Sequence, residues 1–305
     1  MLLANGREHV QRFPGVAIEE HLEILKKGVK EWNQWRASNP DIEPDLRQAD
    51  RQGADLSDAN LAGAILQRAS LQKTDLQHAD LEGADLYEAR LQRCNLDRAN
   101  LRGATLQRSN LKKATLVETD LYEADLKQAR MEAADLTRAK LAGADLSGAM
   151  LDETRFAGAD LEAAVLEEAK CVRADFSSAQ LAKANFEGAD LQQADFRDAD
   201  LRNANLKLCD LKSADLRRAN LEGADLSGSY LRGADLQGAS LAGANLYDAD
   251  LQRANLQDAN LTGANLRGAD LREAYCTSDQ LAEAIEADPD GIDDLSVSDS
   301  HLDGA

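Results

Sequence analysis

The chain has 305 residues, a formal net charge of −20 and an aromatic content of only 4%. It contains no run of eighteen apolar residues, which excludes the pattern of a transmembrane helix. Its first fifteen residues lack the long apolar core and the cleavage site of a secretory signal, so we expect a cytoplasmic protein. The four cysteines form no Cys-x-x-Cys pair and are expected to be buried, reduced, small apolar side chains.

Residues 1–44 form a leader, and its sequence predicts one helix over about residues 17–37. Gly28 weakens this helix, and the sequence Ser-Asn-Pro at 38–40 ends it. Apolar side chains recur every three or four residues and form a single stripe, at Ile18, Leu22, Leu25, Val29 and Trp32. We interpret the stripe as a lid over the structure that follows. The alternative is a seam for a partner, including a homodimer formed through this terminal cap.

A five-residue repeat fills residues 45–276. From Leu46 to Leu271 a large apolar residue returns at every fifth position, with a small residue two places before it, and Arg51 is the one charged residue at such a centre. Five residues fit neither the 3.6-residue turn of a helix nor the two-residue alternation of a strand. The spacing instead predicts short extended pieces joined by corners that all turn the same way, so that the chain coils around a Leu/Ala interior.

A second period sets the number of corners in one coil. Phenylalanines recur at 156, 176 and 196, and glycines recur at intervals of twenty, as at Gly63, Gly83 and Gly103. These glycines stand two residues after the central leucine, where a type II turn requires a positive φ. Twenty residues contain four pentapeptides, so we expect a four-sided coil of about 11.5 turns and a rod about 55 Å long. A three-sided coil of fifteen residues fits these recurrences less well.

These repeats resemble a known family. The stretches ADLEGADL (79–86) and ANLTGANLRGADL (259–271) are similar to the A(D/N)LXX repeats of pentapeptide-repeat proteins, and the resemblance covers about three quarters of the chain. It implies an all-β solenoid, a right-handed quadrilateral β-helix of about 11–12 coils. The large and small apolar positions would point inward, with the structural core including Leu81, Leu86, Leu91, Leu96, Phe156, Phe176 and Phe196.

A short helix is expected to close the other end. Residues 277–289 contain a helical pattern from about Ser278 to Ala287, and Thr277 and Gln280 have the spacing of a capping box. Leu281 and Ile285 share a face that can cover the last coil. Residues 290–305 are acidic, contain little to bury and are expected to form a mobile tail.

No catalytic or cofactor-binding motif is present. The four histidines are scattered without metal-ligand spacing, and there is no phosphate-binding loop, Gly-x-Ser-x-Gly or His-Glu-x-x-His sequence. Most aspartates stand just before the central leucine, where they are interpreted as a requirement of the repeat. The sequence therefore predicts a protein that is not an enzyme and needs no metal or other cofactor.

The outer surface carries uneven charge. If successive pentapeptides from residue 45 are assigned in turn to four faces, the net charges of the four faces are about −4, +4, −6 and −4. We interpret the positive second face as ordinary solvated charge. The alternative is a partner-binding surface, either for an acidic protein or for the acidic tail of another copy. Its basic residues are Lys73, Arg90, Arg93, Lys112, Lys113, Arg130, Lys170 and Arg173.

Two functions remain open from the sequence. The first is a non-catalytic rigid rod that acts as a protein-interaction or scaffold module, with an unknown protein partner and no contact with a membrane or with nucleic acid. The second is implied by the resemblance, because some pentapeptide-repeat proteins imitate DNA and bind type II topoisomerases such as gyrase. The repeat array carries only about −10, and no loops interrupt it, so the first function is favoured.

Overall fold

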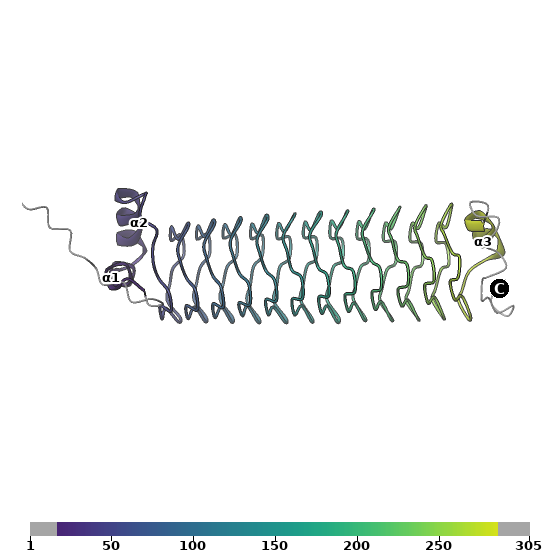
Figure 1. Ribbon diagram of the computed structural model, residues 1–305, viewed down its shortest axis with the longest axis horizontal. Coiled ribbons are helices and arrows are strands. Elements are labelled where there is room, and N and C mark those ends of the chain that lie inside the picture. Colours follow the sequence, from purple (N-terminus) through teal and green to yellow (C-terminus); the bar gives the residue numbers. More distant parts are fainter. Residues whose placement is uncertain (1–16, 286–305) are drawn as a thin grey trace, which may run out of the picture.

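The computed structural model describes residues 17–285, which form a straight rod with helices at its two ends (Figure 1). Helices α1 (Glu19–Lys27) and α2 (Val29–Ser38) lie at the amino-terminal end, and α3 (Ser278–Ile285) lies at the other. The predicted acidic tail and the last residues of the predicted second cap lie outside the described residues.

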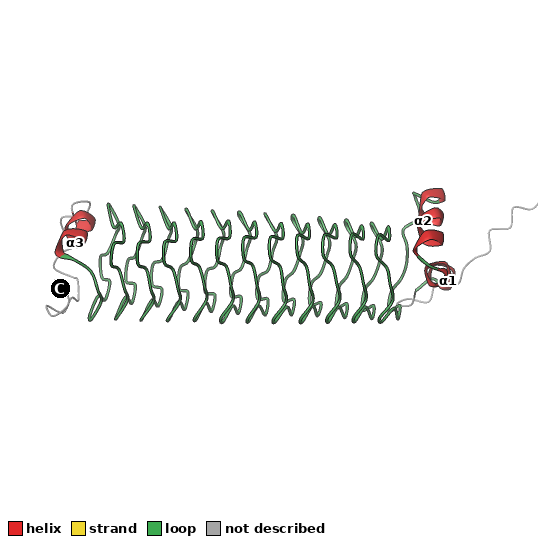
Figure 2. Cartoon of the chain, turned by 180° about the vertical axis from the view of Figure 1, so that it is seen from behind, coloured by secondary structure: helices red, strands yellow, loops and turns green. Residues whose placement is uncertain are grey.

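Every turn of the coil contains twenty residues. Each parallel β-bridge joins a residue to the one twenty positions later, from Asp45↔Ile65 to Asn255↔Tyr275. At twenty residues per turn, the 230 residues between positions 45 and 275 make 11.5 coils, and the coils stack as a regular column (Figure 2). The four-sided coil predicted from the phenylalanine and glycine periods is therefore confirmed. We call residues 45–49 and their equivalents every twenty residues the first face, and those from 50, 55 and 60 the second, third and fourth.

The expected extended pieces are shorter than a strand. Between residues 17 and 285 each side of the coil contributes a single bridging residue, followed by a two-residue turn, and no longer strand forms. The reason is geometric, because a side of five residues that must also contain a corner leaves room for only one residue to pair with each neighbouring coil.

One pentapeptide, residues 85–89, shows how every backbone N–H group finds an acceptor. The N–H groups of Asp85, Leu86 and Glu88 donate to neighbouring coils, and that of Ala89 donates to Leu86 O within its own turn. The remaining N–H, that of Tyr87, donates to Asp85 Oδ1 at 3.0 Å. Because an unsatisfied backbone group is costly, an Asp or Asn before the central leucine completes the set. The prediction that these aspartates serve the repeat is confirmed.

The corner residue two places after the centre adopts the left-handed conformation. Gly83 has a φ of 62°, and the non-glycine residue at the next corner, Glu88, has a φ of 54°. The positive φ expected from the glycine spacing is thus present, and it holds for other residue types too. Backbone hydrogen bonds to the neighbouring coils fix this conformation even where a Cβ atom makes it less favourable.

The interior is a close-packed column of leucine, phenylalanine and small side chains. Leu81, Leu86, Leu91 and Leu96 are at most 1% exposed, and Phe156, Phe176 and Phe196 are fully buried. The rings of these three phenylalanines stack at 4.9 Å between centroids, which gives the rise of one coil and a column about 56 Å long. Arg51 remains the exception: it is half-buried in the first coil, and its Nε has no hydrogen-bond partner in the described part of the chain.

The amino-terminal cap is two helices where the sequence predicted one. Acidic Glu19 and Glu20 open α1 and basic Lys26 and Lys27 close it, an order that suits the helix dipole. Gly28 then separates α1 from α2 with a φ of 126°, a value outside the helical range. The prediction of a single helix over residues 17–37 is therefore wrong, because the glycine breaks the helix rather than merely weakening it.

The cap replaces the coil that would otherwise precede the first one. On the first face, the N–H of Ile18 donates to Asp45 O at 3.1 Å, and the N–H of Asp45 donates to His21 Nδ1 at 3.0 Å. On the fourth face, Trp32 Nε1 donates to Asn60 O at 2.7 Å, and the N–H of Asn60 donates to Asn33 Oδ1 at 2.8 Å. These contacts satisfy the exposed edge of the solenoid, which would otherwise invite pairing with another chain.

The carboxyl-terminal cap uses the capping box that the sequence predicted. The N–H of Thr277 donates to Gln280 Oε1 at 2.9 Å, and the N–H of Gln280 donates to Thr277 Oγ1 at 3.3 Å. Gln280 Nε2 also donates to Leu256 O and Ala259 O, both at 2.8 Å. One glutamine therefore caps α3 and holds it against the carbonyl groups of the last coils.

Candidate docking surface

The eight basic residues predicted from the sequence all lie on the second face, and all are exposed. They occupy three kinds of position. Arg90, Arg130 and Lys170 are bridging residues, whereas Lys73, Arg93, Lys113 and Arg173 stand at the left-handed corner and Lys112 one place before it. Because one coil contains twenty residues, residues twenty apart in the sequence are neighbours along the rod.

Six of the eight form a continuous patch over four successive coils. The second-face pentapeptides 70–74, 90–94 and 110–114 contain five cations and no acidic residue. Glu132 enters only in the fourth coil, where it pairs with Arg130 at 3.1 Å and Lys112 at 3.8 Å. We call these six residues the basic patch: Lys73, Arg90, Arg93, Lys112, Lys113 and Arg130.

Four cations of the basic patch, Lys73, Arg90, Arg93 and Lys113, make no ion pair with any described residue. Three of them, at 73, 93 and 113, stand in one column with φ values of 57–59° and a spacing of one coil. The backbone holds these three residues about 5 Å apart from one coil to the next, so the like charges on their side chains repel one another. An anion bound over this column would relieve that repulsion.

Lys170 and Arg173 are separated from the basic patch, although the sequence grouped them with it. The intervening pentapeptide of the second face carries Asp152 and Glu153, and Arg173 forms an ion pair with Glu153. Their charge is therefore partly neutralised, and the face does not present one uninterrupted basic surface along its length.

The predicted set stopped at residue 173, but the second face continues to residue 274. Lys212 pairs with Asp210 at 2.9 Å, and its Nζ lies 5.1 Å from the ring centre of Tyr230, which is 48% exposed. Further along, Arg253 pairs with Glu273 at 2.6 Å. The period of twenty extended to the end of the array would have found these residues. They show that acidic partners neutralise most cations in the carboxyl-terminal half of the face, where Arg232 is the one cation without an ion pair to a described residue.

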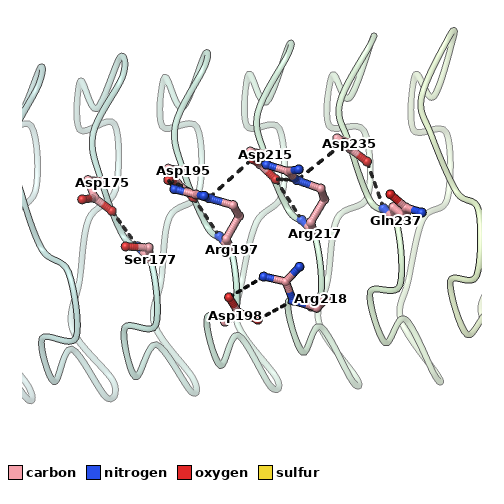
Figure 3. A network of polar contacts seen from close by, with 10 residues as sticks. All are labelled: Asp175, Ser177, Asp195, Arg197, Asp198, Asp215, Arg217, Arg218, Asp235 and Gln237. Carbon is pink, nitrogen blue, oxygen red and sulfur yellow. Dashed lines mark hydrogen bonds and ion pairs between the residues drawn. The ribbon is translucent and has the colours of Figure 1, made fainter.

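The third face gives the contrast that identifies the basic patch. There, arginines and aspartates form a ladder through successive coils (Figure 3). Arg197 pairs with Asp195 in its own coil and lies 3.6 Å from Asp215 in the next, and Arg217 repeats the arrangement with Asp215 and Asp235. The ladder satisfies its own charges, whereas four of the six cations in the basic patch have no ion-pair partner among the described residues and can bind a ligand.

Arginine contacts of this kind lower the pKa of three aspartates: Asp215 in the ladder, Asp200 on the fourth face and Asp270 on the second face. The side-chain hydrogen bond from Arg202 lowers the pKa of Asp200, and that from Arg272 lowers the pKa of Asp270. Partial burial acts to raise the pKa of Asp215, but hydrogen bonds from Arg217 outweigh it and leave the pKa lowered. A carboxylate whose pKa is lower in the folded state stabilises that state above its unfolded pKa, about 3.9, and loses the effect as the pH falls through the folded pKa.

We therefore expect the stabilisation from the ladder to depend on pH. Arg217→Gln should lower the free energy of unfolding by at most about 1 kcal/mol at pH 7, because the pair is exposed. The difference from wild type should shrink below about pH 4 and disappear near pH 2, when the aspartates are protonated in both proteins. Urea unfolding at each pH measures the difference.

Arg232→Gln is the matched control, because Arg232 is exposed and makes no ion pair with any described residue. It removes the same charge without breaking a ladder contact, so its effect should be near zero throughout the pH range. A loss in Arg217→Gln that persists unchanged at pH 2 would contradict a carboxylate contribution.

A ligand pocket, a metal site and a membrane-spanning helix have less support than the docking surface. A cavity of about 460 Å³ lies beside the amino-terminal cap, but two of its lining residues, His21 and Asp45, hydrogen-bond to each other as part of the cap. No cluster of three potential metal ligands is found among residues 17–285. Over the same residues, no helix combines the length and apolar character needed to cross a membrane.

Comparison with known protein families identifies the repeat. A family model for pentapeptide repeats matches the chain in eight copies, over residues 54–93, 94–132, 129–167, 169–207, 209–248 and 249–278. A search of curated proteins found no match to the chain.

Several proteins of known structure are similar to this chain in sequence. HetL, a pentapeptide repeat protein involved in heterocyst differentiation regulation in the cyanobacterium Nostoc sp. strain PCC 7120, is 34% identical, with 78% of this chain and 93% of HetL covered and a TM-score of 0.33. A pentapeptide repeat protein of the Arabidopsis thaliana thylakoid lumen is 35% identical over 35% of this chain and 76% of its own, with a TM-score of 0.34. QnrB1, a plasmid-mediated fluoroquinolone resistance protein, is 19% identical over 59% of this chain and 84% of its own, with a TM-score of 0.38.

Proposed function

The chain belongs to the pentapeptide repeat family, and from that premise we propose that it is a non-catalytic rod that binds an acidic protein partner through its basic patch. The rod serves as an interaction or scaffold module. Its stiff, hydrogen-bonded core holds outward side chains at fixed spacings, as solenoids do when they present an extended binding surface.

The observation that carries this proposal is the set of four cations in the basic patch that make no ion pair with any residue the structure describes. Elsewhere on the rod, arginine and lysine side chains commonly face an acid in the same coil or the next, as Arg217 does with Asp215. A cluster without such partners, on a chain with a net charge of −20, is unusual because nearby acids are plentiful. Complementary charge of this kind speeds association and selects among partners.

Reversing the charge of the patch tests the proposal. A variant with Arg90, Arg93, Lys112 and Lys113 all changed to glutamate should lose a captured protein partner by at least about tenfold, because each attractive contact becomes repulsive. The measurement is affinity purification with quantitative mass spectrometry, followed by titration of the identified partner. Circular dichroism verifies that the variant still folds.

A matched control makes the same change of eight charge units on the opposite side of the coil. It changes Arg102, Lys140, Lys183 and Arg202 of the fourth face to glutamate. This control should retain the partner. Equal binding by wild type and the second-face variant would refute the basic patch as the docking surface. Equal loss of binding in both variants would show that net charge alone causes the effect.

The alternative is an acidic mimic of DNA that binds a type II topoisomerase, and it has less support. Duplex DNA carries one charge per roughly 1.7 Å, about 33 over the length of this rod, whereas the array from 45 to 274 carries about −10. Several of its acids are also committed to the turns, as Asp85 is to the N–H of Tyr87. A gyrase supercoiling assay separates the two functions, since inhibition at low stoichiometry is expected only of the mimic.

A further inference from the structure

The basic patch limits what can bind to it. Its cations lie within an area about four coils long, or roughly 15–20 Å, and they face outward from a regular, uninterrupted surface. The first, third and fourth faces are net negative, at about −4, −6 and −4. An acidic, extended segment is therefore attracted to this patch and repelled by the other three sides of the rod.

The chain itself contains a segment with that chemistry. Residues 286–305, beyond α3 and outside the described residues, carry seven carboxylates and no lysine or arginine. The carboxylates are those of Glu286, Asp288, Asp290, Asp293, Asp294, Asp299 and Asp303. The segment carries seven negative charges and the basic patch six positive ones, two of which already pair with Glu132, so the two sets are complementary in sign.

The length of the rod decides which copy can supply the segment. Arg93, near the centre of the basic patch, lies about nine coils from the last bridging residue, Tyr275, a distance of roughly 45 Å at 4.9 Å per coil. An extended chain spans at most about 3.5 Å per residue, so about thirteen residues are needed to cover that distance from Ile285. Only Asp299 and Asp303 of the seven could then reach the patch of their own copy.

We propose that the basic patch binds residues 286–305 of a second copy of this chain, so that copies join head to tail. A second copy can bring any of the seven carboxylates to the patch, whereas its own copy can bring only two. The inference rests on the proposed function, because it names the acidic occupant of the same surface. The contact is heterologous, since patch and segment are different parts of the chain, and such contacts produce closed rings or open chains of copies.

The test measures the mass of the full chain by light scattering or sedimentation at increasing concentration. In about 20 mM salt the average mass should rise above the 33.0 kDa of one copy, and in 0.5 M salt it should return to that value because the attraction is screened. A tail variant neutralises all seven acids to Asn or Gln, and a patch variant carries the four glutamates described above. Each variant alone should associate at least tenfold more weakly than wild type.

Mixing the two variants gives the sharpest result. The tail variant has an intact patch and the patch variant has an intact acidic segment, so a mixture can form one contact only. It should yield a 1:1 complex of about 66 kDa, twice the mass of one copy, while wild type continues to longer chains. Failure of the mixture to associate, or association of either variant alone at wild-type strength, overturns the proposal.

Other outcomes separate this inference from the proposed function. If wild type stays at 33.0 kDa in low salt but the patch variant loses its captured protein partner, the docking function stands and the second copy is not its ligand. If wild type stays at one copy and neutralising the tail strengthens binding of that partner, the segment lies on the patch of its own copy, which also overturns assembly between copies.

Discussion

Replacing Phe176 with alanine should lower the free energy of unfolding by about 3–5 kcal/mol. The ring is fully buried, is stacked at 4.9 Å against both Phe156 and Phe196, and meets the edge of Phe186 at 5.7 Å. Alanine would remove all three contacts and leave a cavity in the middle of the column. The cavity cannot easily collapse, because backbone hydrogen bonds fix the spacing of the neighbouring coils.

Urea unfolding followed by circular dichroism measures this loss, with Leu208→Ala as the control. Leu208 is 59% exposed, so its truncation should change the free energy of unfolding by no more than about 0.5 kcal/mol. Since each coil contacts only its neighbours, the cavity in Phe176→Ala should also divide the transition between the two halves of the array. A loss below about 1 kcal/mol would show that the column is not packed as the ring contacts indicate.

The second large effect is expected at the amino-terminal cap, where Trp32→Ala should cost about 3–5 kcal/mol. The Trp32 side chain is fully buried, and its Nε1 donates to Asn60 O at 2.7 Å. Trp32→Phe retains an aromatic ring but leaves that carbonyl without its donor, so a smaller loss of about 1–3 kcal/mol is expected. The comparison separates packing from the hydrogen bond that closes the first coil.

The chain offers a local probe for this prediction. Its only two tryptophans, Trp32 and Trp35, both lie in α2, so tryptophan fluorescence reports on the cap while circular dichroism reports on the whole rod. In wild type the two signals should change together. In Trp32→Phe the remaining Trp35 should report loss of the cap at a lower urea concentration than the rod. Coincident transitions at the wild-type midpoint in this variant would contradict a closing role for Trp32.

Much of the fold could be predicted because its determinants are local and repeated. The spacing of Leu81, Leu86 and Leu91 requires a corner in every pentapeptide, and the recurrence of Phe156 and Phe176 sets twenty residues per coil. The capping box at Thr277 could also be predicted from the sequence, since its two partners are three residues apart. The break at Gly28 was misjudged, because the sequence shows the weakness of a glycine but not the angle at which the second helix must meet the first coil.

The charged surface was also predictable only in part. The sequence alone placed the eight cations on one face, since the period of twenty assigns each residue to a side. It did not show that Arg173 pairs with Glu153 while Lys113 has no ion pair within residues 17–285, because partners lie up to twenty residues away and meet only through stacking. Nor did it show that Trp32, Asn33 and His21 replace the hydrogen bonds of a missing coil. Short-range apolar spacing thus determined the winding of the rod, and only the tertiary structure decided which backbone groups and charges remain unsatisfied.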